Sequence, residues 1–131
     1  MSAEVSGEVP VTFAKGVLDD VGELTATAAD YDQAHRDEAE ALKRRIAELL
    51  VECKGNPFIG ELMGPGLHSE LADCRRVRFD VPSYASKPRF RLIYRNEPSD
   101  GAPAECHWLA IAPRSGLRAH RKAQQRSPRS S

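Results

Sequence analysis

The sequence of 131 residues is 40% hydrophobic and 29% charged, which predicts one globular domain and excludes fibrous and membrane-spanning classes, since no apolar run approaches roughly 20 residues. The segment MSAEVSGEVPVTF has no secretory signal pattern, and the three cysteines form no CxxC pair, so we expect a reduced, cytoplasmic protein without a membrane partner. The formal net charge is zero, yet residues 1–68 carry thirteen acids against six bases and residues 69–131 carry six acids against thirteen bases. This asymmetry indicates that one part of the molecule faces a polyanion.

The N-terminal half predicts a short strand followed by two helices, after a flexible segment over residues 1–7. The strand covers residues 8–13, and a weak helix follows over residues 15–24. The strongest helical pattern starts at residue 31 or 33 and ends near residue 52, where Gly55, Asn56 and Pro57 stop it. Its apolar residues recur at intervals of three and four, namely at Leu42, Ile46, Leu49 and Cys53.

The C-terminal half predicts a run of strands after a glycine-rich loop over residues 60–66. The strand candidates cover residues 71–81, 88–95 and 105–112, a short helix covers residues 117–125, and residues 126–131 form a disordered tail. Helices grouped before neighbouring strands are typical of the α+β class. We therefore predict a single domain over residues 8–125, with a small antiparallel meander sheet packed on one side by two N-terminal helices, and with a short C-terminal helix.

Arginines alternate with apolar residues along the first two of these strands. Because successive side chains of a strand point to opposite faces, Val77, Phe79 and Val81 should face the core and leave Arg76 and Arg78 on the open face. In the same way Phe90, Leu92 and Tyr94 leave the open face to Arg89, Arg91 and Arg95. Guanidinium groups gathered on one face repel each other, and a phosphate backbone is the partner that their planar donor groups fit.

The third strand has a similar alternation but carries no arginine until its end. Leu109 and Ile111 should face the core, and Ala110 and Ala112 should lie on the open face, where their small size leaves room beside the arginines. Arg114 follows directly after this strand.

Three segments of the C-terminal half read RRVRFDVP, PRFRLIYRNE and WLAIAPRSGLRAHRKAQQR, and ALKRRIAELL and GNPFIGELMG precede them. The three segments together resemble the core of the RelE/ParE toxin superfamily of toxin–antitoxin systems, closer to its RelE-like mRNA endonucleases, and the two preceding ones resemble the segment before that core. The likeness extends from about Val9 to Gln125. It implies a RelE/ParE-like fold and a toxin that is inhibited by a cognate antitoxin protein.

The resemblance also implies site residues for a metal-independent endoribonuclease that cleaves mRNA at the ribosome without a cofactor. Arg91 and Arg114 match basic residues that hold the scissile phosphate, and His120 lies where many relatives have the Tyr that acts as acid or base. These three are the predicted catalytic residues. The predicted RNA- and phosphate-binding residues are all arginines: Arg76, Arg78, Arg89, Arg95, Arg118 and Arg121.

Two other functions stay open beside the endoribonuclease. A ParE-like inhibitor of DNA gyrase shares the fold but usually lacks this set of arginines with a terminal Tyr or His, and a non-catalytic relative would only bind a partner protein. His107 beside Cys106 has no second Cys/His pair at ligand spacing, so no metal site is predicted.

Overall fold

The computed structural model describes residues 8–26, 32–64, 69–82 and 86–127. The segments predicted to be flexible, residues 1–7 and the last four residues of the tail, lie outside these ranges. The described chain contains five strands, three α-helices and two 3-10 turns. In chain order they are β1 (Val11–Phe13), α1 (Val17–Leu24), α2 (Gln33–Gly55), β2 (Glu61–Leu62), η1 (Ser69–Leu71), β3 (Cys74–Phe79), β4 (Phe90–Glu97), β5 (Glu105–Pro113), η2 (Ser115–Leu117) and α3 (Arg118–Arg126).

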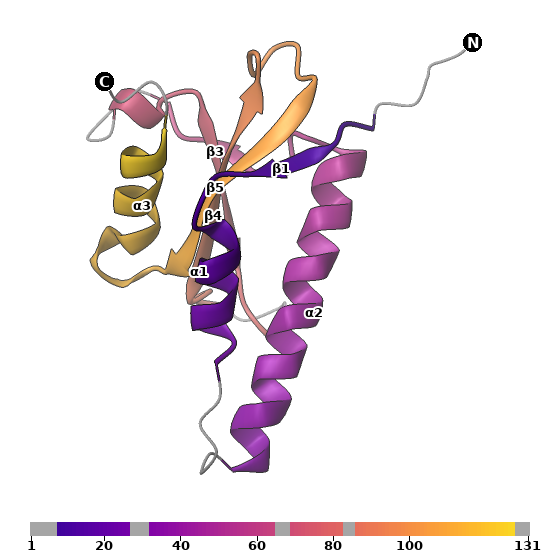
Figure 1. Ribbon diagram of the computed structural model, residues 1–131, viewed down its shortest axis with the longest axis vertical. Coiled ribbons are helices and arrows are strands. Elements are labelled where there is room, and N and C mark those ends of the chain that lie inside the picture. The colour runs from indigo at the N-terminus through magenta and orange to yellow at the C-terminus, as the bar shows by residue number, and fades with distance from the viewer. Residues whose placement is uncertain (1–7, 27–31, 65–68, 83–85, 128–131) are drawn as a thin grey trace.

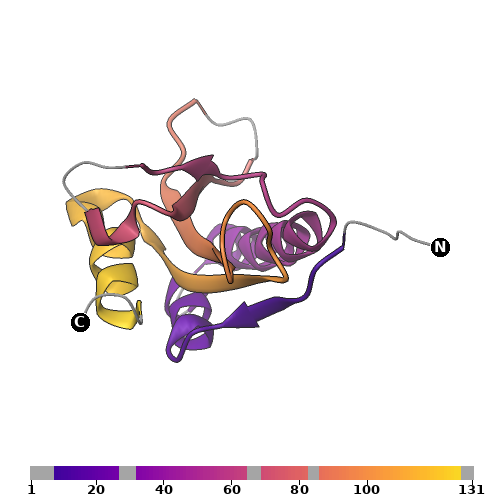
Figure 2. The same ribbon diagram turned by 90° about the horizontal axis from the view of Figure 1, so that it is seen from above.

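The strands form one sheet in the order β1-β5-β4-β3-β2. Strands β3, β4 and β5 are the predicted antiparallel meander, which is confirmed. The sheet is nevertheless mixed, because β1 pairs in parallel with β5. Strand β2 pairs with β3 inside the segment predicted to be a glycine-rich loop. Figure 2 separates the two edges of the sheet, with β1 at one and the segment that carries β2 at the other.

The N-terminal helices cover one face of the sheet, as predicted (Figure 1). Asp32 caps the N-terminus of helix α2, because its carboxylate accepts a hydrogen bond from the backbone N–H of His35 at 3.0 Å. Its inner side is the predicted apolar stripe, buried against β3, β4 and β5. None of the helices in the described part of the chain is both long and apolar enough to cross a membrane.

Helix α3 covers part of the opposite face, which the sequence left open. Ala119 and Ala123 of α3 are buried against Ile93 and Leu109, and in Figure 1 the helix lies across the sheet from α1 and α2. The C-terminal helix was predicted to end at residue 125, whereas α3 includes Arg126, and Ser127 behind it is only 4% exposed.

A β-bulge explains why the predicted faces of β5 are partly wrong. Ile93 pairs with Ala110 while Tyr94 pairs with Trp108, so that Leu109 is an extra residue in β5. The extra residue reverses the alternation: Trp108 and Ile111 both pack toward α2, and Leu109 packs toward α3. Ala110 and Ala112 do lie on the face opposite α2, but helix α3 buries them there.

A buried carboxylate joins α1 to α3 across the edge of the sheet. Asp20 is 1% exposed and accepts from Lys122 Nζ at 2.7 Å, from Arg126 Nη1 at 2.7 Å and from the backbone N–H of Ile111 at 3.1 Å. Arg126 Nη1 also donates to the carbonyl of the bulge residue Leu109 at 2.9 Å. Asp20 thus holds the bulge, α1 and α3 together.

Candidate nucleic-acid interface

Four arginines from three neighbouring segments form the candidate site, and we call them the arginine cluster. Arg76 and Arg78 lie on β3, Arg91 lies on β4, and Arg114 follows β5. Arg78 and Arg91 are direct cross-strand partners, and the backbone N–H of Arg114 donates to the Arg89 carbonyl at 2.7 Å, which continues the β4–β5 pairing beyond the strand. The structure therefore brings these four predicted residues together.

The cluster has more positive charge than the chain neutralises. The pKa of Arg91 is lowered, first by burial and then by the charges of Arg78, Arg76 and Arg114. Within the described ranges no carboxylate forms an ion pair with Arg91 or Arg114, and Arg91 Nη1 donates instead to the carbonyls of Pro88 and Phe90 at 2.9 and 3.0 Å. Such an arrangement favours the binding of an anion that brings several oxygen acceptors.

Glu61 of β2 is the one acid that the structure adds to this cluster among the described residues. Its Oε1 lies 2.9 Å from Arg76 Nη2 and 3.5 Å from Arg78 Nη2. These contacts hold the pKa of Glu61 below its ordinary value, with the hydrogen bond from Arg76 as the largest cause. The side chain is 56% exposed, and exposed ion pairs contribute at most about 1 kcal/mol, so that a stronger anion can displace it.

Glu61 was not among the predicted site residues, because β2 is only two residues long and lies in a glycine-rich segment that shows no alternation. A signal exists in the register, since Glu61 is the direct partner of Arg76. That register becomes visible only once the segment is known to pair with β3.

Two of the predicted phosphate ligands, Arg95 and Arg89, are neutralised by carboxylates of the chain itself. Arg95 was expected on an open face, but it is 0% exposed, because the end of α3 covers it. It donates to Glu97 at 2.8 Å and to the Ser127 hydroxyl at 2.6 Å. Arg89 makes a two-pronged contact with Asp80, and the shortest of its hydrogen bonds there is 2.7 Å.

The remaining predicted residues lie on α3. Arg118 and Arg121 are exposed, so both are accessible to a polyanion. His120 is only 6% exposed and shares the inner side of the helix with Ala119 and Ala123. A group that transfers a proton to RNA must touch it, so a catalytic role of His120 requires a local opening at α3. No three His, Cys, Asp or Glu side chains group as metal ligands within the described residues.

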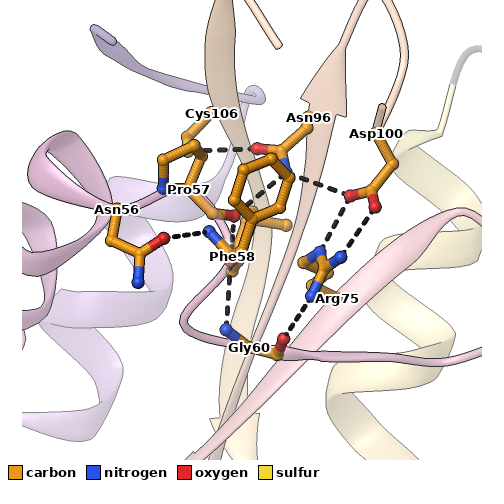
Figure 3. Close-up of polar contacts among 9 residues, drawn as sticks. Asn56, Pro57, Phe58, Gly60, Arg75, Asn96, Asp100 and Cys106 are labelled. Carbon is orange, nitrogen blue, oxygen red and sulfur yellow. Dashed lines mark hydrogen bonds and ion pairs between the residues drawn. The ribbon is translucent and has the colours of Figure 1, made fainter. Parts of the chain in front are cut away.

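A loop over residues 56–60 connects α2 to β2 and is fixed to the sheet by Arg75. The guanidinium of Arg75 donates to both carboxylate oxygens of Asp100 at 2.8 and 2.7 Å, and to the carbonyl of Gly60 at 2.7 Å. It also lies 5.0 Å from the centre of the Phe58 ring. Figure 3 shows Arg75 between Gly60 and Asp100. The pKa of Asp100 is lowered, mainly by the hydrogen bonds from Arg75.

Buried side chains of β4 hold the same loop from the other side. Tyr94 donates its hydroxyl proton to the Pro57 carbonyl at 2.6 Å and accepts from the Gly60 N–H at 3.2 Å. The amide nitrogen of Asn96 donates to Pro57 at 2.9 Å and to Asp100 at 3.0 Å (Figure 3). The loop, and with it the backbone next to Glu61, is therefore fixed at several points.

Replacing Gly60 with alanine is expected to destabilise the protein by about 1–3 kcal/mol, the range for overpacking. An added Cβ would lie 3.0 Å from Arg75 Cβ and 3.1 Å from both the Arg76 carbonyl and the Tyr94 ring. Urea unfolding measures the change, and Gly101→Ala is the matched control because nothing lies within 4 Å of its added Cβ. Equal midpoints for the two variants would contradict the close approach at Gly60.

The chain resembles a known protein in its fold, and not in a family-wide sequence pattern. No protein-family model matches the chain, and no curated protein matches it. Among solved structures, the chain is similar to an arginine-to-alanine double mutant of the E. coli toxin RelE in the free state. The TM-score is 0.52 at 16% sequence identity, and the match covers 92% of this chain and 98% of that chain. The chain thus has a RelE-like α+β fold, as the resemblance of its C-terminal segments implied.

Proposed function

We propose that this chain is the toxin of a toxin–antitoxin system and that it cleaves mRNA at the ribosome as a metal-independent endoribonuclease. The observation that carries the proposal is the arginine cluster, in which Arg91 is surrounded by three like charges and pairs with no carboxylate of the described chain. Arginine donors fit phosphate oxygens better than any other side chain does. The RelE-like fold, shared with a protein named as a toxin, agrees with this assignment.

In this reaction the 2′-hydroxyl of a ribose loses its proton and its oxygen attacks the adjacent phosphorus. The bond to the 5′-oxygen of the next nucleotide breaks, and that oxygen takes up a proton. The products are a 2′,3′-cyclic phosphate and a free 5′-hydroxyl. Negative charge grows on the phosphorus oxygens along this path, and donors already in place stabilise it most effectively. Arg91 and Arg114 would supply them, with Arg76 and Arg78 binding the flanking phosphates.

His120 is the proposed acid or base, since an imidazole titrates close to neutral pH. Its burial, at 6% exposure, also favours a second candidate function, in which the protein binds RNA on the arginine cluster without cleaving it. The two candidates share the binding surface and differ only in the proton transfer.

An antitoxin protein is the proposed partner in both cases. Acidic side chains that lie over the arginine cluster would mask it and block RNA, because opposite charges at an interface direct the docking of the partner. An antitoxin that left the cluster open in the complex would contradict direct masking.

Induced expression of the wild-type chain in a bacterium is expected to arrest growth and to create new 5′ ends in an abundant mRNA, detected by primer extension. His120→Ala should lose those ends while the protein accumulates to the same level. Arrest without mRNA cleavage would point to gyrase or another target and would contradict the proposal. RNA binding without arrest or cleavage would favour the non-catalytic candidate, and cleavage by His120→Ala would remove that residue from the mechanism.

A further inference from the structure

We infer that Glu61 is a specificity-determining residue that favours ribose over deoxyribose at the arginine cluster, and that Arg75 and Asp100 are the positioning residues that keep it there. This inference rests on the proposed function, because it assumes that the cluster binds a nucleic-acid backbone. It goes beyond that proposal by naming the group that separates RNA from DNA.

A carboxylate among phosphate-binding arginines has an electrostatic cost for any nucleic acid. Glu61 shares the guanidinium groups of Arg76 and Arg78, and these contacts keep it ionised. A phosphate that binds Arg76 and Arg78 therefore replaces Glu61 as their acceptor, and its negative charge then lies beside that of Glu61. With Glu61 present, a backbone that offers only phosphate oxygens binds more weakly than it would to the four arginines alone.

RNA can offset this cost and DNA cannot. An ionised carboxylate only accepts hydrogen bonds, and the one backbone donor of a nucleic acid is the ribose 2′-hydroxyl, which is the group that distinguishes RNA from DNA. When a phosphate displaces the Glu61 side chain from Arg76, the backbone of Glu61 stays in β2, so the Glu61 carboxylate remains beside the cluster. It is then free to accept the 2′-hydroxyl proton in a hydrogen bond.

This role requires that the backbone of Glu61 keeps its place when its side chain moves. Strand β2 has only two residues, so that its own pairing with β3 is a weak anchor. The preceding residue, Gly60, is held through its carbonyl by Arg75 and through its N–H by Tyr94. Asp100 fixes the Arg75 guanidinium with two hydrogen bonds, so that it acts on Glu61 only through Arg75 and the loop over residues 56–60.

The test compares three single-stranded oligonucleotides of one sequence: RNA, DNA with uracil bases, and RNA with 2′-fluoro substituents. Fluorine keeps the sugar pucker of ribose but is not a donor. Fluorescence anisotropy, read within seconds of mixing, gives the Kd of each. For the wild-type protein we expect RNA to bind about tenfold more tightly than either of the other two, the lower range for one charged hydrogen bond at an exposed site.

Replacing Glu61 with alanine should make the three affinities equal, mainly by tightening the binding of DNA. Glu40→Ala is the control: it removes the same charge from an exposed ion pair with Lys43 on α2, and it should leave the preference for RNA unchanged. Asp100→Asn should lose most of the preference, whereas Asp100→Asn in the Glu61→Ala background should change nothing further. That lack of additivity separates positioning from a general loss of stability.

Two results would overturn the inference while RNA binding, and with it the proposed function, stands. One is a preference for RNA that Glu61→Ala does not change, and the other is a 2′-fluoro oligonucleotide that binds as tightly as RNA. If the wild-type protein bound none of the three, the proposed function itself would be wrong, and this inference with it.

Discussion

Arg91→Gln is expected to weaken RNA binding roughly ten- to hundredfold, the equivalent of one or two charged hydrogen bonds, and to slow any cleavage by about 10²–10³-fold. Arg91 is central in the cluster: burial lowers its pKa most, and the charges of Arg78, Arg76 and Arg114 lower it further. This burial and repulsion predict an opposite effect on folding. A base whose pKa is lowered in the folded state is less stable there as a cation, so the neutral variant should unfold at the same urea concentration or a higher one.

Arg44→Gln is the matched control for this experiment. Arg44 is exposed on α2, which packs on the opposite face of the sheet, and its replacement changes the net charge equally. RNA affinity at several salt concentrations separates the two variants. The logarithm of the association constant falls with the logarithm of the salt concentration, and each lost phosphate contact makes that fall less steep, by about 0.9 for a duplex and about 0.7 for a single strand. Equal slopes and affinities for the two variants would remove Arg91 from the RNA-binding surface.

The arginine cluster could be predicted from the sequence because it depends on local rules. Alternation along β3 and β4 is unbroken over Arg76, Arg78 and Arg91, and the meander connection sets these strands next to each other. The apolar stripe of α2 was equally readable, since helical periodicity alone selects its buried side. In both cases each pattern lies within a single element, and only the pairing of strands that are neighbours in sequence has to be known.

The errors arise where a distant segment decides the outcome. Arg95 lies on the same face of β4 as Arg91, but the end of α3 covers it. Its hydrogen-bond partner there, Ser127, is 32 residues away in sequence. The bulge at Leu109 is held by Arg126 of α3 and is not encoded in the apolar pattern of β5. Glu61 joins the cluster only because β2 pairs with β3. Burial by another element and pairing of a two-residue strand leave no periodic signal.

The errors at Arg95 and at the bulge share one cause: the sequence predicted a short C-terminal helix without placing it, and α3 packs against the sheet face. It buries the alanines of β5, covers Arg95 and fixes the bulge. Arg114 lies between β5 and α3, and α3 is joined to α1 by the hydrogen bonds of Lys122 and Arg126 to Asp20.

Asp20→Asn is expected to destabilise the protein by about 3 kcal/mol, the lower end of the range for breaking a buried ion pair. The lower end applies because Lys122 and Arg126 are 27% and 20% exposed and keep some contact with water. The asparagine side chain still has one acceptor oxygen. Its NH2 group is a donor, however, and would face the donor groups of Lys122 or Arg126. Urea unfolding measures the loss, and Asp19→Asn, an exposed neighbour on α1, should change the free energy of unfolding by no more than about 0.5 kcal/mol.

The pH dependence of unfolding tests the same group independently. Burial by itself would raise the pKa of Asp20, but the hydrogen bonds from Arg126, Lys122 and the Ile111 N–H outweigh it and hold the pKa below the ordinary value of 3.8. An acid with a lowered pKa binds fewer protons when folded, so its contribution is complete above about pH 4 and is lost as the pH falls through the folded pKa. The wild-type protein should therefore lose stability more steeply below pH 4 than Asp20→Asn, and the two free energies should converge. Parallel curves across this range would show that Asp20 is not the ionised centre of the α1–α3 contact.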